Sequence, residues 1–149
     1  MNYQLNEQQL QLVERIVTVL EQDNTSPAIA GIVALLLVSP CREMTIDEIQ
    51  EQLQLSKSST NHAINILLQA GMLSYGHKLL ARKRYYRLEV RAWRDFLLKK
   101  LKRQKKLNEL LSEVIEQRPE ETHEFNKHLI DLVNLMEQLH TSSIQLLKK

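Results

Sequence analysis

Ser56-Lys-Ser-Ser-Thr-Asn-His-Ala-Ile-Asn-Ile-Leu-Leu-Gln-Ala-Gly71 is a stretch that predicts one helix with two different faces. Ser56 is a good N-cap, because its hydroxyl can accept a hydrogen bond from a backbone N–H of the first turn. Gly71 suits the position just past a helix, where the chain turns left-handed. At helical spacing, one side can pack and the other carries short polar side chains. The packing side is Thr60, Ala63, Ile64 and Leu67, and the polar side is Ser58, Asn61, His62 and Asn65.

The polar side of this helix has the composition needed to enter a phosphate-lined groove. No Asp or Glu occurs from Ser56 to Ser74, whereas ordinary surface helices carry both acids and lysines. Asn61 and Asn65 can pair with adenine edges, and His62 can donate to a guanine acceptor. Phosphates or bases suit Ser58 and Ser59, while a phosphate suits Lys57 beside the helix N-terminus. The alternative is a hydrated polar face that contacts no base.

The segments on either side complete a winged helix-turn-helix. Thr45-Ile-Asp-Glu reads as a capping box that opens a short helix, with Ile46, Ile49 and Leu53 facing inward. After Gly71 we expect a strand at 72–75, a polar loop at 76–84 and a strand at 85–89. The loop carries three cations that can reach the DNA backbone or the minor groove, or that are simply solvated: Arg82, Lys83 and Arg84.

The rest of the chain predicts helices at about 6–22, 27–39, 91–117 and 120–147. The second is apolar nearly all round and must be buried on several sides. In the last, apolar residues follow a heptad spacing that favours a bundle, and a second copy of the chain is the better cover for it. Those positions are Phe125, Leu129, Leu132, Met136, Leu139, Ser143 and Leu146.

The expected fold class is therefore mainly α. A winged helix-turn-helix DNA-binding domain with a small two- or three-stranded β-wing occupies 27–90. An N-terminal helix for dimerisation or packing occupies 1–26, and a long C-terminal helical dimerisation region occupies 91–149.

Composition narrows the function classes. The chain has 149 residues, 43% of them hydrophobic, with 3 glycines and 1 cysteine. No internal disulfide can form, and the longest apolar run is too short for a bilayer span, so we expect a cytoplasmic protein without membrane partners. No phosphate loop, zinc signature or nucleophile elbow occurs, so we expect no enzyme, cofactor or metal. The segment 82–106 holds 12 basic and 2 acidic residues, net +10, against a total of +2, which indicates a local surface facing a polyanion.

Several further groups of residues allow two interpretations each. Tyr75, Tyr85, Trp93 and Phe96 can line an effector pocket, since aromatic faces attract quaternary ammonium groups, but ordinary packing is the simpler reading. Cys41 can sense redox state, and His123, Glu124 and His128 can bind a metal; packing and solvation are the plainer alternatives. The basic run Lys99–Lys106 can flank DNA or form a solvated helix face.

The sequence resembles the GbsR/MarR-like winged-helix transcriptional regulators. The resemblance runs from about 26 to 117 and is carried by the order of Pro27-Ala-Ile-Ala-Gly, Leu35-Leu-Leu-Val-Ser-Pro, Met44-Thr-Ile-Asp-Glu-Ile, Leu55-Ser-Lys-Ser-Ser, Ala70-Gly-Met-Leu, Arg84-Tyr-Tyr-Arg-Leu and Ala92-Trp. It implies a homodimer that binds double-stranded DNA and regulates transcription, often as a repressor, with a small-molecule effector left open. The competing hypothesis is a winged-helix and coiled-coil module that binds proteins and not DNA.

Overall fold

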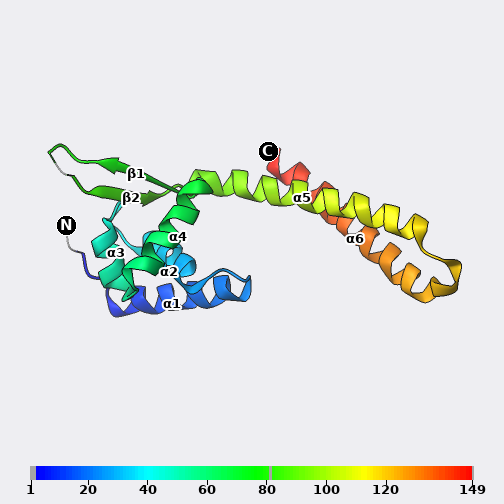
Figure 1. The fold of residues 1–149 in the computed structure, drawn as a ribbon, viewed down its shortest axis with the longest axis horizontal. Coiled ribbons are helices and arrows are strands. Elements are labelled where there is room, and N and C mark those ends of the chain that lie inside the picture. Colours follow the sequence, from blue (N-terminus) through cyan, green and yellow to red (C-terminus); the bar gives the residue numbers. More distant parts are fainter. Residues whose placement is uncertain (1–2, 81, 149) are drawn as a thin grey trace. The chain divides into compact units, whose positions relative to one another are not determined.

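The structure is a computed structural model that describes residues 3–80 and 82–148. It divides into two compact units, which meet between Trp93 and Arg94. Six α-helices, one short 3-10 helix (η1) and one two-stranded sheet follow one another along the described chain (Figure 1). The predicted fold class, a mainly helical winged helix-turn-helix with a long C-terminal helix, is confirmed.

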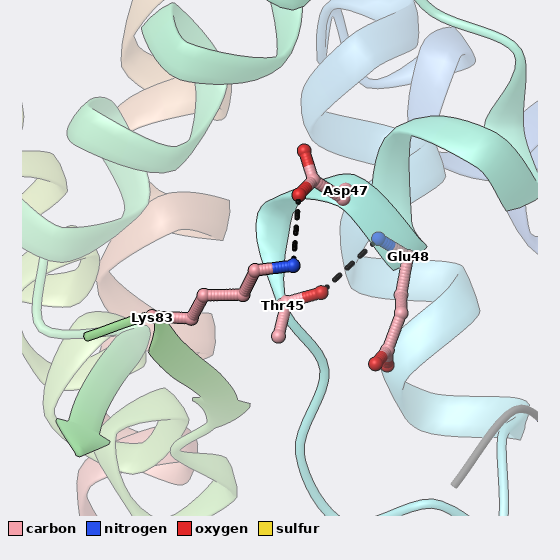
Figure 2. Close-up of polar contacts among 4 residues, drawn as sticks. All are labelled: Thr45, Asp47, Glu48 and Lys83. Atoms are coloured by element: carbon pink, nitrogen blue, oxygen red, sulfur yellow. Dashed lines mark hydrogen bonds and ion pairs between the residues drawn. The ribbon is translucent and has the colours of Figure 1, made fainter. Parts of the chain in front are cut away.

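The first three helices each begin after an N-cap residue, and the capping box expected at Thr45 is only half formed. In α1 (Glu7–Gln22), Asn6 and Gln9 form a reciprocal capping box. In α2 (Pro27–Val38), Ser26 is the N-cap and Pro27 occupies the first turn, where its missing N–H costs nothing. In α3 (Ile46–Leu53), the Thr45 hydroxyl accepts a hydrogen bond from the Glu48 N–H, whereas the Glu48 carboxylate points away and returns no bond among the described residues (Figure 2).

The predicted two-faced helix is α4 (Lys57–Gln69), and its faces lie as expected. Ser56 caps it, and its buried residues are the four of the predicted packing side: Thr60, Ala63, Ile64 and Leu67. Gly71 follows with φ of 75°, in the left-handed region that glycine enters at little cost. Helix α3, a turn and α4 therefore form the helix-turn-helix.

The wing is an antiparallel pair, β1 (Leu73–His77) and β2 (Arg84–Leu88), with Tyr75 opposite Tyr86. Both strands are shifted from the expected ranges, because pairing extends to His77 and Arg84 and shortens the loop to 78–83. Met44 forms a bridge on the outer side of β2, with Met44 N to Tyr86 O at 2.9 Å and Tyr86 N to Met44 O at 2.7 Å. The sheet thus has two strands and a single-residue third position.

Helix α2 is the centre of the first unit, as its apolar sequence predicts. It contacts α1, α3, α4 and β2, and every residue from Ala30 to Leu36 is buried. The core continues through Ile49, Ile64 and Leu73, and Trp93 packs against its edge. This packing holds α4 rigidly by one face and leaves the other face open.

The second unit is a helical hairpin. Helix α5 (Val90–Gln117) is followed by the 3-10 turn η1 (Glu120–Thr122) and by α6 (His123–Leu147), so the last helix starts three residues later than expected. Asn108 of α5 is buried and its side-chain amide donates to the Val133 carbonyl at 3.3 Å and to the Glu137 carboxylate at 3.0 Å. No helix in the described ranges is both long enough and apolar enough to cross a membrane.

Candidate nucleic-acid interface

The open face of α4 presents a row of polar side chains. Ser58, Asn61, His62 and Asn65 are all exposed, on the side opposite the buried stripe. Lys57 begins the helix, is exposed, and forms no ion pair within the described part of the chain. The face therefore offers amide, imidazole and hydroxyl groups next to one cation and one helix N-terminus, without a carboxylate between them.

Ser59 has a different local role from its neighbours. Its N–H donates to the Ser56 hydroxyl oxygen at 3.1 Å, and the Ser56 hydroxyl donates to the Ser59 hydroxyl oxygen at 2.9 Å. Ser59 thus completes the helix cap. Its hydroxyl hydrogen stays free to donate outward, so a phosphate oxygen could still be its partner.

Three cations of the wing already have partners within the protein. Lys83 Nζ lies 3.5 Å from Asp47 Oδ2 in the first turn of α3 (Figure 2). Lys78 Nζ lies 3.6 Å from Glu43 Oε1, and the Arg84 guanidinium lies 4.3 Å from the centre of the Tyr75 ring. The two ion pairs join the wing loop to the start of α3 and to the segment before it.

Arg82 differs from the two residues that follow it. It is exposed, and no ion pair involves it among the described residues. Of the three predicted wing cations, Arg82 is therefore the one whose charge is free of an acidic or aromatic neighbour.

The tip of the wing carries an apolar feature that the sequence analysis missed. Leu79 and Leu80 are 93% and 99% exposed, and Leu80 has φ of 66°, which is unusual for a residue other than glycine. The sequence shows two leucines inside an otherwise polar loop. The local pattern does not indicate whether such leucines are exposed at the tip of the loop or buried against the core.

The wing sheet separates two of the four predicted effector residues. Tyr75 is opposite Tyr86 whereas Tyr85 is opposite Gly76, so the side chains of Tyr75 and Tyr85 leave opposite faces of the sheet. Each ring is covered by a cation of the wing itself, Arg84 on Tyr75 and Lys78 on Tyr85 at 4.3 Å. Trp93 packs on the core of the first unit, and Phe96 is exposed in the second.

The structure shows the surroundings of the remaining candidate residues. Cys41 is half-buried, and its N–H donates to the Ser39 hydroxyl at 3.1 Å. The part of the chain that is described holds no group of three or more His, Cys, Asp or Glu placed to bind a metal, and this covers His123 and His128. Every Lys and Arg from Lys99 to Lys106 is exposed on α5.

Comparison with solved structures supports the fold. A crystal structure described as a transcriptional regulator matches with a TM-score of 0.64 and 17% identity, covering 93% of this chain and 96% of that chain. At this identity the match shows a shared fold. The adhesin competence repressor of Streptococcus pyogenes matches at a TM-score of 0.41, with 16% identity over 92% of this chain and 99% of that one. A MarR family regulator from Neisseria meningitidis matches at 0.40, with 18% identity over 93% and 99%.

The first of these three matches, with a TM-score of 0.64, is the one that shows the shared fold. No protein-family model matches the sequence, and no curated protein matches it.

Proposed function

We propose that the protein is a sequence-specific DNA-binding transcriptional regulator of the MarR-like type, acting as a homodimeric repressor. The proposal rests mainly on the difference between the two faces of α4. Its apolar stripe is fully used by the core, and its exposed stripe holds Ser58, Asn61, His62 and Asn65 with no acid among them. The GbsR/MarR-like resemblance of the sequence and the shared fold with a transcriptional regulator point the same way.

In this proposal α4 lies in the major groove and reads base edges. Asn61 and Asn65 are one turn apart on α4, so both amides can pair with adenines on neighbouring steps, and His62 can donate to a guanine acceptor. The N–H groups of the first turn and Lys57 hold a phosphate, which sets the register without reading sequence.

Affinity has to come from outside α4, because α4 carries a single cation. The wing supplies Arg82 and, once Asp47 is displaced, Lys83. Each phosphate that is neutralised should contribute about 0.9 to the slope of log affinity against log salt. A second copy of the chain doubles these contacts and places two α4 helices for half-sites about one DNA turn apart. The site of action that we propose is the cytoplasm, where such a target would lie.

The test is anisotropy titration of the full chain with labelled DNA from upstream of its own gene, and with shuffled DNA of the same composition. The unaltered protein should prefer the upstream DNA and lose affinity steeply with salt. The Asn61→Ala/Asn65→Ala variant should lose most of that preference, by about tenfold or more, while the salt slope stays nearly constant. Gln11→Ala, which removes an exposed amide from α1, is the control and should change neither.

Two results would contradict the proposal in different ways. If the double variant keeps its preference for the upstream DNA, the assignment of the reading residues is wrong. If the unaltered chain binds neither DNA in a salt-dependent way, the competing function as a protein-interaction module takes its place.

A further inference from the structure

A partly enclosed, mostly apolar cavity in the first unit lies where α1, α2 and α3 meet. It has a volume of about 410 Å³, within the range of small-molecule sites. Most of its wall is apolar and comes from all three helices and from the turn that follows α3: Leu5, Leu10, Val13, Val17, Pro27, Gly31, Leu35, Leu53 and Leu55. Neither the wing nor the polar face of α4 contributes to it, so it is separate from the candidate nucleic-acid interface.

The floor of this cavity is firm. Leu35 is 1% exposed and Val13 is 7% exposed, so both belong to the core of the unit. At Gly31 an added Cβ would lie 3.4 Å from the Leu53 side chain, so α2 and α3 are in close contact at this point. At one edge, the Gln52 side-chain amide donates to the Tyr3 carbonyl at 3.2 Å, which fixes the segment before α1 to α3.

The charge at the cavity is all of one sign. Among the residues that the structure describes, its only charged lining residues are Glu14 and Glu21, and its only other polar ones are Thr18 and Gln52. Glu14, Thr18 and Glu21 lie on one face of α1, at spacings that bring them into line. Neither carboxylate forms an ion pair within the described ranges, and no Lys or Arg lines the cavity. An apolar floor with a carboxylate rim matches a ligand that has an apolar body and a cationic head.

We propose that this cavity binds a small organic cation with an apolar body, such as an alkylammonium compound. The apolar part would displace water from the leucine and valine floor, which is the main favourable term. The head would lie between the carboxylates of Glu14 and Glu21. Those groups are exposed, so each should contribute only modestly, and the attraction should weaken with salt.

This binding does not depend on whether the protein recognises DNA, so it is measured without DNA. The probe is hexyltrimethylammonium, titrated into the full chain by calorimetry. The comparators are tetramethylammonium, which has the head alone, and octanoate, which has a similar tail with the opposite charge. We expect saturable binding of one hexyltrimethylammonium per chain, and at least about tenfold weaker binding of both comparators.

Paired variants separate the local carboxylates from the overall charge. Glu14→Gln/Glu21→Gln should weaken hexyltrimethylammonium binding about three- to tenfold, because two exposed ion pairs are lost. Glu7→Gln/Glu51→Gln removes the same number of charges from the same unit but none from the cavity wall. It should leave the affinity within about twofold. Amide NMR shifts on binding should be confined to α1, α2, α3 and Leu55.

Four outcomes would overturn the assignment. Octanoate binding as tightly as the cation would remove the electrostatic argument, as would equal affinities for the two double variants. Absence of saturable binding by hexyltrimethylammonium up to about 1 mM would remove the site itself. Shifts at the same residues on raising the protein concentration without probe would mean that a second copy of the chain covers the cavity.

A link to regulation rests in addition on the proposed function. Leu53 ends α3, and Leu55 directly precedes the Ser56 cap of α4. A ligand in the cavity would therefore contact both sides of the turn between α3 and α4. Hexyltrimethylammonium should then change the affinity for the upstream DNA, and Glu14→Gln/Glu21→Gln should blunt that change. If the probe binds but the DNA affinity is unmoved, the cavity assignment stands and only the coupling fails.

Discussion

Asp47 decides how much of the positive charge of the wing is available to a polyanion. Its carboxylate lies 3.5 Å from Lys83 Nζ, and both side chains are well exposed. Exposed pairs of this kind contribute at most about 1 kcal/mol to stability, so the pair does not hold the fold together. Its effect is on the surface potential, because a carboxylate stands beside a cation that would otherwise face a phosphate.

Replacing Asp47 by Asn should therefore strengthen DNA binding. We expect about two- to fivefold tighter binding at low salt and a rise of up to about one unit in the salt slope, since Lys83 becomes free to neutralise a phosphate. Anisotropy titration at several salt concentrations measures both quantities. The control, Glu51→Gln, removes a charge from the same helix but from no described ion pair.

A double-variant cycle makes the argument specific to Lys83. Lys83→Gln should weaken binding more in the Asp47→Asn background than in the unaltered protein, because only there is the lysine free beforehand. Equal losses in both backgrounds would show that the ion pair has no bearing on DNA binding.

Two left-handed residues flank α4, one in the turn before it and one after it, and they differ in how well their side chains suit that conformation. Gly71 has φ of 75° and open space where a Cβ would stand, whereas Gln54 has φ of 53° with a full side chain. Gly71→Ala should lower the free energy of unfolding by about 1 kcal/mol, entirely through the backbone. Gln54→Gly should leave it unchanged or raise it slightly, since relief of strain offsets the freedom gained by the unfolded chain. Chemical denaturation followed by circular dichroism gives both values, and a loss at Gln54 as large as at Gly71 would contradict the explanation.

At the residue scale, the features that could be predicted from the sequence are those that depend on local patterns. The caps at Thr45 and Ser56 and the buried stripe of α4 follow from side chains a few positions apart, and all are present in the structure. The Lys83–Asp47 pair joins residues that are distant in the sequence, and it depends on the register of the wing. The stacking of Arg84 on Tyr75 is the same kind of contact, so neither could be read from the sequence.

At the scale of the elements, the hairpin of α5 and α6 contains one buried polar side chain. Asn108 is 4% exposed, and its Oδ1 has no hydrogen-bond partner in the described part of the chain. A buried acceptor left unpaired costs about 1–3 kcal/mol, which offsets what its amide gains from Val133 and Glu137. A buried polar residue of this kind favours one helix register at the expense of stability.

Asn108→Leu should stabilise the protein, because it removes the unpaired oxygen while keeping a γ-branched side chain with the same number of heavy atoms. We expect a gain of about 1 kcal/mol, or about 3 °C in the melting temperature. Glu137 is exposed, so its carboxylate can regain water when it loses the amide donor. Asn108→Ala should destabilise, because it leaves a hole. Thermal unfolding gives the order Leu above Asn above Ala, and Asn134→Leu, at an exposed position of α6, controls for added hydrophobicity. A fall in melting temperature for Asn108→Leu would show that the amide contacts outweigh the unpaired oxygen.

The heptad of α6 shows what a sequence pattern can and cannot predict for a whole helix. The spacing predicted an apolar seam, and the hairpin uses part of it: Leu129, Met136 and Ser143 are half-buried. The alternate set is exposed, and periodicity could not tell which set the chain covers by folding back on itself. That division depends on the crossing of α5 over α6, which only the tertiary structure fixes.

At the scale of the whole molecule, the exposed set is an uncovered stripe. It repeats every seven residues along α6, with Phe125 at 55%, Leu132 at 46%, Leu139 at 59% and Leu146 at 71% exposure. A continuous apolar row of this length marks an interaction surface in most soluble proteins. A heptad period is typical of a helix that packs against a partner helix. The proposed recognition of paired half-sites also requires a two-fold partner.

Leu132→Glu/Leu139→Glu should therefore give a folded monomer. Burying each leucine is worth about 1.5–3 kcal/mol, and a two-fold interface loses four of them, so the dimer dissociation constant should rise at least about a thousandfold. Sedimentation equilibrium over about 1–50 µM measures it, and circular dichroism checks that helix content is kept. Asn134→Glu/Gln138→Glu adds the same charges to exposed positions of the same helix that lie off the stripe, and should remain dimeric. Because each half-site alone binds weakly, the leucine variant should also lose the preference for upstream DNA while α4 is untouched. A stripe variant that still sediments as a dimer would place the interface elsewhere, and an unaltered chain that is monomeric throughout this range would remove the two-fold recognition of DNA.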